Sequence, residues 1–168
     1  MQKPVITWLD SNLDVLAEIK FKKGEATTLK KGETSDATVV KIANNFVKST
    51  QKDEAVFDAL DCVLSVKAVS EEAESILVKE KWLSVAVVDD EELSYTQIGG
   101  ETGSAVTLDI YAKDLKEKKG ISGAANNGTE NTANIATLNI TAGVPAETTA
   151  EGGRKDFVLV LAYSYGEQ

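Results

Sequence analysis

The stretch "TVVKIANNF" (residues 38–46) joins an extended run to two consecutive asparagines. Its β-branched residues, among them Val40 and Ile42, favour a strand. Asparagine tolerates left-handed backbone angles and hydrogen-bonds to its own main chain. We therefore predict a strand that ends in a turn at Asn44 and Asn45, displayed at one end of the molecule and free to contact solvent or a neighbour.

Apolar and polar residues alternate with a period of two in several further stretches, which is the pattern of a half-buried strand. The clearest are "IATLNITAGV" (135–144) and "DFVLVLAYSY" (156–165). Both faces of 156–165 are apolar, so we predict that it is covered on both sides at the centre of a sheet. Other stretches with strand patterning are 5–9, 16–21, 37–42, 62–69, 81–88 and 94–98.

Helical patterning is weak and confined to short pieces. The region 53–80 is ambiguous. We favour a strand over 61–69, because β-branched residues crowd there, and a short helix or loop over 70–77, where Ser70, Glu72 and Glu74 resemble a helix start with acids in its first turn. A second helical turn is predicted over 113–120, with Gly120 as its C-cap.

The segment 99–134 begins with "GGETGS" and ends in a run rich in glycine and asparagine. We interpret it as a loop or hairpin insertion within one domain that spans residues 1–168. Seven to nine short strands separated by turn residues predict an all-β fold, an antiparallel β-sandwich with at most one or two short helices.

Composition excludes several classes of protein. The 168 residues carry a formal charge of −9, and such a field repels phosphate backbones, so we expect no nucleic-acid partner. No apolar run reaches the roughly 20 residues that cross a bilayer, and no signal peptide is visible at the start, so we expect no membrane partner and folding in a reducing cytoplasm. The single cysteine, Cys62, lies in an apolar run and is interpreted as a small buried residue.

The residue types that most catalytic sites need are missing. The chain has no histidine, which removes Ser-His-Asp and Cys-His catalysis and imidazole metal ligands. Phosphate-binding and nucleophile-elbow motifs are absent as well. We therefore predict a non-enzymatic protein with no catalytic, cofactor-binding or metal-binding residues, no cofactor and no small-molecule substrate.

Two weaker signals leave alternatives open. The run "DDEE" (89–92) concentrates carboxylates that suit Ca²⁺, but it lacks the spacing of an EF-hand loop, and a solvated acidic turn is the alternative. Trp8 and Trp82 could stack on sugars if exposed, yet each lies in an apolar strand pattern that favours core packing. Paired acids for glycoside hydrolysis cannot be tested by sequence, because some pair among 27 acidic residues always satisfies the spacing.

Two resemblances add a specific hypothesis. The amino-terminal run, "PVITWLDSN" through "LKKGETSDATVVKIANN", resembles immunoglobulin-like modules in which a strand and a glycine turn precede a strand that ends in asparagine. The chain also resembles small structural proteins encoded among the head and tail genes of tailed bacteriophages of Gram-positive bacteria. The matching stretches are "ITWLDSN" near the start, "YTQIGG" (95–100), "ANNGTENTANIATLNITAGVP" (125–145) and "DFVLVLAYSYG" (156–166). The chain departs from the pattern after "DSN", where "LDVLAEIKFKKG" contains no tryptophan.

The resemblance implies an immunoglobulin-like sandwich and a virion component made in the host bacterial cytoplasm. Its implied role is a capsid decoration protein that binds the phage major capsid protein on the outer surface of the head, as a homo-oligomer. Candidate contact regions are the segment around Trp8 and the loop 99–134. The alternatives are a tail-tube or neck protein, an extracellular carbohydrate-binding or adhesion module and, last, an enzyme that works without histidine.

Overall fold

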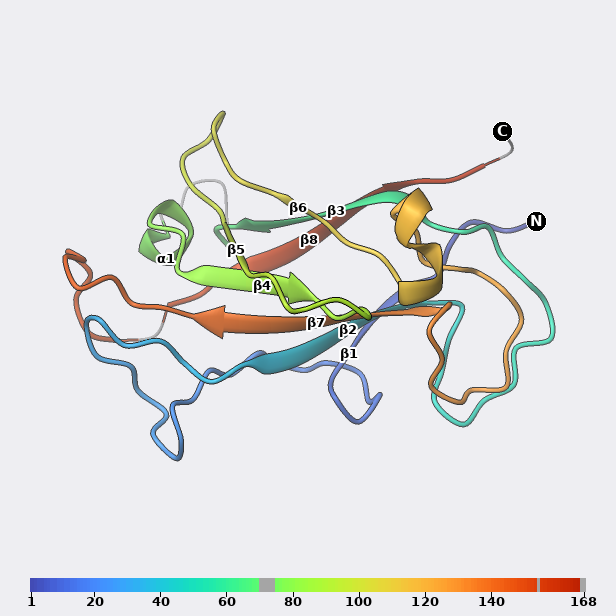
Figure 1. Cartoon of the computed structure of the whole chain (residues 1–168), viewed down its shortest axis with the longest axis horizontal. Coiled ribbons are helices and arrows are strands. Elements are labelled where there is room, and N and C mark those ends of the chain that lie inside the picture. Colours follow the sequence, from blue (N-terminus) through green and yellow to red (C-terminus); the bar gives the residue numbers. More distant parts are fainter. Residues whose placement is uncertain (70–74, 154, 167–168) are drawn as a thin grey trace.

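In the computed structural model, which describes residues 1–69, 75–153 and 155–166, two antiparallel β-sheets pack face to face (Figure 1). The described residues form eight strands, so the predicted all-β sandwich is confirmed. The strands are β1 (Ile6–Leu9), β2 (Thr38–Asn44), β3 (Leu60–Lys67), β4 (Leu83–Val87), β5 (Thr96–Ile98), β6 (Leu108–Asp109), β7 (Ile135–Ala142) and β8 (Val158–Ser164).

The larger sheet has the strand order β1-β2-β7-β4-β5. Its register pairs Val40 with Leu138, and Val85 with Ile140, so the buried residues of neighbouring strands lie side by side on one face. Because side chains alternate along a strand, the residues between them, such as Asn139, lie on the opposite face. The period-two pattern is the burial pattern of β7 from Ala136 onwards, whereas in β2 every residue from Val40 to Asn44 is buried.

The smaller sheet has the order β6-β3-β8, which corrects the prediction that 156–165 is a central strand. β8 lies at an edge, and Val158 and Tyr163 are exposed. The prediction was wrong because apolar residues on a strand are not always buried by a neighbouring layer. Leu159 and Leu161 do pack against the core, whereas the other face of the strand carries no covering layer among the described residues.

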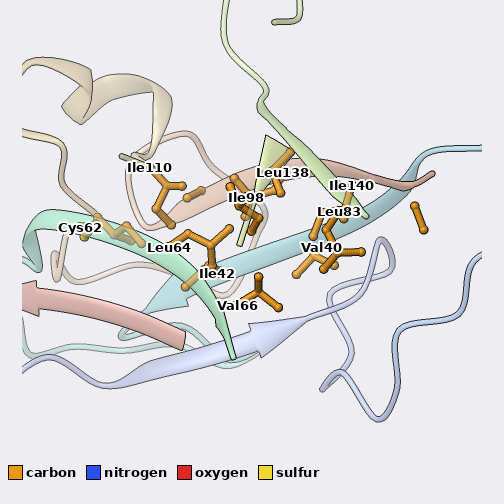
Figure 2. Packing of buried hydrophobic residues seen from close by; sticks show 14 of the residues in the cluster. Val40, Ile42, Cys62, Leu64, Val66, Leu83, Ile98, Ile110, Leu138 and Ile140 are labelled. Carbon is orange, nitrogen blue, oxygen red and sulfur yellow. The ribbon is translucent and has the colours of Figure 1, made fainter. Parts of the chain in front are cut away.

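The main core fills the space between the two sheets (Figure 2). Ile42 and Leu138 come from the larger sheet, Cys62 and Leu64 from the smaller one, and all four are fully buried. The segment 99–134 contributes too, since Ile110 is equally buried within it. Its first part turns back on itself through a bridge between Gly99 and Val106 and exposes residues 101–105 at its tip.

The stretch 16–21 does not form a strand, contrary to the prediction. After a turn over residues 10–14, Leu16 donates its N–H to the carbonyl of Trp8, and the chain then leaves the edge of the larger sheet. Its apolar residues Leu16, Ile19 and Phe21 pack against the core from outside the sheet. Apolar spacing predicted burial here, but apart from this bond and the one that Asp36 donates to the carbonyl of Lys22, no ladder of backbone bonds joins the segment to a described strand.

Two short helices lie at opposite ends of the sandwich (Figure 1). In α1 (Ile76–Lys79) the side chain of Ser75 caps the first turn by accepting the N–H of Val78; the proposed start at Ser70, Glu72 and Glu74 lies outside the described residues. In the 3-10 helix η1 (Lys113–Lys118) the left-handed cap is Lys119, with φ 48°, so the prediction of Gly120 as the cap was one residue late.

The asparagine turn is buried, which corrects the prediction that it faces solvent. Asn44 is fully buried and Asn45 is 6% exposed, with the left-handed φ of 54° that its residue type favours. The side chain of Asn44 accepts the N–H of Val5 at 2.9 Å and donates to the carbonyls of Phe57 and Ile121 at 3.0 and 3.2 Å. The turn therefore fastens three separate segments together instead of presenting a contact surface.

Candidate functional site

A groove of about 1080 Å³ opens between the two sheets at the end of the sandwich where α1 lies. Its floor is apolar and includes Trp8 from β1, Trp82 from the residue before β4 and Leu159 from β8. The stretch 16–22 forms one wall, and the aromatic rings of Phe21 and Phe157 approach to 6.2 Å between centroids. The groove lies where 16–22, bonded to β1 through Leu16 and Trp8, continues past Phe157 without forming a ladder of backbone bonds with β8.

The two tryptophans occupy different depths of this groove. Trp82 is 8% exposed, and its indole N–H donates to the carboxylate of Glu80 at 3.0 Å. The hydroxyl of Thr148 and this indole N–H lower the pKa of Glu80, since both bonds favour the charged carboxylate. The prediction that Trp82 packs in the core is confirmed, while Trp8 is half-buried and lines the opening. The structure therefore does not place the two rings on one exposed face.

Charged residues ring the groove. Lys20, Lys22, Lys31 and Lys155 lie there with Glu18, Glu151 and Asp156. Lys155 donates to the backbone carbonyl of Glu151 at 2.7 Å. The chemistry of the site is that of an apolar slot with a mixed polar rim, suited to an extended or aromatic group and not to acid–base work on a buried substrate.

The acidic run 89–92 lies elsewhere, at the end of β4. Asp89 accepts the hydroxyl of Tyr111 at 2.6 Å and pairs with Lys116 at 3.1 Å. The bond from Tyr111 is the largest cause that lowers the pKa of Asp89 to about 2. Lys113 pairs with Asp90 at 2.7 Å. These partners tie η1 to the end of β4, so the run works as a set of ion pairs.

The residues described by the structure contain no group of three or more His, Cys, Asp or Glu side chains placed to hold a metal ion. The thiol of Cys62 is fully buried, and burial raises its pKa to about 12, as expected for a structural cysteine. No helix within the described ranges is long and apolar enough to cross a membrane.

A third region includes residues 121–134 of the predicted contact loop 99–134, but the bonds that join it to residues 45–58 were not predicted. At the end of the sandwich opposite α1, the loops 45–58 and 121–134 run together, and we call them the locked end (Figure 1). Buried asparagine side chains join them: Asn45 donates to the carbonyls of Glu54 and Gly123, both at 3.0 Å, and Asn134 donates to the carbonyl of Ala124 at 2.9 Å. The frequency of asparagine in 125–134 is the signal for this region, but composition alone indicates only a loop.

No protein-family model, no curated protein and no solved structure matches the chain. Any assignment of function therefore rests on the fold, on the groove, the acidic run and the locked end, and on the sequence resemblance.

Proposed function

We propose that the protein is a non-enzymatic virion structural protein of a tailed bacteriophage, a capsid decoration protein with an immunoglobulin-like sandwich that binds the major capsid protein on the outer surface of the head. The proposal includes a homo-oligomeric arrangement in the virion and synthesis in the host bacterial cytoplasm. The phage assignment comes from the sequence resemblance, and the two antiparallel sheets suit it.

The main observation in support of the proposal is that buried side chains hold the loops of the locked end together. Its loops have little regular structure, yet Asn44, Asn45 and Asn134 bind them to one another through buried side chains. The buried ammonium of Lys41 also pairs with Glu130. A surface that is ordered before binding loses less conformational entropy on contact, which suits a protein that docks on a repeating lattice.

The locked end also presents exposed side chains for contact. Val47 is 47% exposed at the tip of one loop. Residues 47–51 and 127–131 lie together there because Ser49 donates its N–H to the carbonyl of Gly128 at 2.9 Å. We assign this end as the surface that faces the capsid.

The test uses capsids of the encoding phage, prepared from a deletion strain that lacks this gene. Purified protein is expected to bind them saturably and to raise their melting temperature in calorimetry. Val47→Asp should weaken binding, whereas Val69→Asp, the same change at an exposed valine two residues beyond the end of β3, should not. Capsids whose melting temperature does not respond at saturating protein would contradict the proposal.

A tail-tube or neck protein is the second candidate, favoured by the exposed tip 101–105, which projects beyond the sheets (Figure 1). Such loops can join neighbouring rings. Negative-stain microscopy separates the two candidates, because a tail-tube subunit assembles into rings or tubes and a decoration protein stays as small particles. A carbohydrate-binding module is less well supported, because Trp82 turns its ring into the core.

A further inference from the structure

Among the described residues, no strand pairs with the outer edge of β8, so backbone N–H and C=O groups on that edge have no strand partner. Four strands lie at sheet edges, and β8 is seven residues long whereas β1, β5 and β6 have four, three and two. Its sequence, "VLVLAYS", contains neither a charged residue nor proline. Proteins usually protect edge strands by shortening them or by placing charges or proline there, so an uncharged edge of this length is suited to pairing with another chain.

The hydrogen bonds of β3 reveal which groups of β8 face outward. Ile110 donates its N–H to the carbonyl of Cys62 at 3.1 Å, so the backbone of Cys62 points towards β6. Directions alternate along a strand, and the backbone of Val63 therefore points towards β8, where it pairs with Ala162. On β8 itself, Ala162 faces β3, and the residues on either side of it face the other way. The outward groups are thus the N–H and C=O of Leu159, Leu161 and Tyr163.

We propose that two copies of this chain pair through β8, antiparallel and about a twofold axis at Leu161. The outward residues are symmetric about that position, so Leu161 meets its own copy and Leu159 meets Tyr163 of the other. In an antiparallel pair, residues that face each other in this way exchange both N–H···O=C bonds. The two smaller sheets then form one continuous sheet, and no outward group of the strand is left unpaired.

Side chains support the same register. Tyr163 and Tyr165 are 37% and 50% exposed, and they lie on the same face of β8 as Leu159. In the pair, Tyr163 of one copy lies opposite Leu159 of the other, and Tyr165 lies opposite Phe157. Both Leu159 and Phe157 line the apolar groove, so the groove of each copy receives the exposed tyrosines of its partner.

Charged residues lie near the two ends of β8 in this arrangement. Near the start of β8, Lys67 of β3 lies opposite Val158 in the strand register, and Lys155 and Asp156 precede the strand. At the other end, Asp61 accepts a hydrogen bond from Ser164. Antiparallel pairing brings Lys155 and Asp156 of one copy to the end of β8 near Asp61 of the other, and Lys67 and Asp61 lie one strand away from the partner, on β3.

Sedimentation equilibrium on the purified full chain tests the pairing, with Tyr163→Pro as the variant. Proline removes an outward N–H without removing a bond to β3, and the other outward groups remain. We expect a monomer–dimer equilibrium that Tyr163→Pro weakens about tenfold or more, since the dimer loses two symmetry-related hydrogen bonds and tenfold corresponds to about 1.4 kcal/mol. The control Tyr163→Thr lacks the ring but keeps the N–H, so the difference between the two variants reports on the backbone.

Residue-resolved hydrogen exchange on the unmodified chain gives a readout that does not depend on any variant folding. The amides of Leu159, Leu161 and Tyr163 should become protected as concentration rises, whereas those of Val160 and Ala162 should be protected at all concentrations because they bond to β3. A chain that remains monomeric at about millimolar concentration, or exchange at the outward amides that does not change with concentration, would overturn the proposal. Pairing is measured without capsids, so its failure leaves the proposed binding to the capsid untouched, and the reverse also holds.

Discussion

Replacing Asn44 by alanine should destabilise the protein more than its small change in volume suggests. The side chain satisfies three backbone groups, the N–H of Val5 and the carbonyls of Phe57 and Ile121. A buried group left without its partner costs about 1–3 kcal/mol. The bonds to Val5 and Phe57 are partly buried, so water can replace some of what they lose, and we expect a total of about 3 kcal/mol.

Urea unfolding followed by tryptophan fluorescence measures this loss, because Trp8 and Trp82 pack against the core. For a chain of 168 residues, about 3 kcal/mol corresponds to a fall of about 6–12 °C in melting temperature, which calorimetry checks independently. The control is Asn139→Ala, which removes a half-exposed asparagine from the outer face of the same sheet. It should cost no more than about 0.5 kcal/mol. Equal effects of the two substitutions would refute the role given to Asn44.

A second substitution at the same position tests the directions of the bonds. Asn44→Asp has the same shape and still accepts the N–H of Val5, but it brings a carboxylate against the carbonyls of Phe57 and Ile121. Burial and these carbonyls favour the protonated form, so the folded-state pKa lies above the unfolded one. The stability of the variant is then greatest below the unfolded pKa and is lost as the pH rises through the folded pKa. If Asn44→Asp lowers the free energy of unfolding by the same amount at pH 4 and at pH 7, the assigned bond directions are contradicted.

Three further predictions concern other parts of the molecule. The pKa of Asp89 is lowered to about 2, so the carboxylate stabilises the fold fully above its ordinary pKa near 4, and this stabilisation is lost as the pH falls towards 2. Between pH 4 and pH 2 the urea midpoint of Asp89→Asn should therefore fall less than that of the unmodified protein. The exposed control Asp90→Asn should behave like the unmodified protein. A methyl group on Gly123 would lie 2.3 Å from the nearest backbone carbonyl oxygen, so Gly123→Ala should cost about 1–3 kcal/mol or more in thermal unfolding, whereas Gly152→Ala, with open space around it, should be near neutral. The thiol of Cys62 should not react with a disulfide reagent until urea unfolds the chain, and rapid reaction of the folded protein would contradict its burial.

The sequence predicted the strands that have one covered face and failed where pairing depends on distant segments. The alternation in 135–144 predicts β7 because half of its residues face the core and the other half face away. The same kind of alternation in 16–21 forms no strand ladder, although Leu16 bonds to Trp8 of β1, and periodicity holds no information about which segments pair. The prediction for Asn44 was wrong for a related reason: its left-handed neighbour suits a turn, but whether a turn is exposed depends on the loops 45–58 and 121–134 that fold over it.

The groove could not be predicted either, because its lining comes from separate parts of the chain. Trp8, Phe21, Trp82 and Phe157 converge there only after both sheets have formed. Each was recognisable as an apolar residue in an extended run, and the core packing expected of Trp82 followed from that alone. Composition could not reveal that the sheets separate on one side and leave space between these rings.

The wrong prediction for the position of β8 bears directly on how the protein assembles. The apolar residues on both of its faces predicted an inner strand, yet in the single chain it lies at an edge. The pattern of a strand depends on everything that surrounds it, including any partner that it binds. Pairing through Leu159, Leu161 and Tyr163 would make β8 an inner strand of a sheet shared by two copies, which is the position that the sequence predicted. The disagreement between sequence and fold then arises because one chain is only part of the assembly, and the protected amides of the outward edge are where that can be measured.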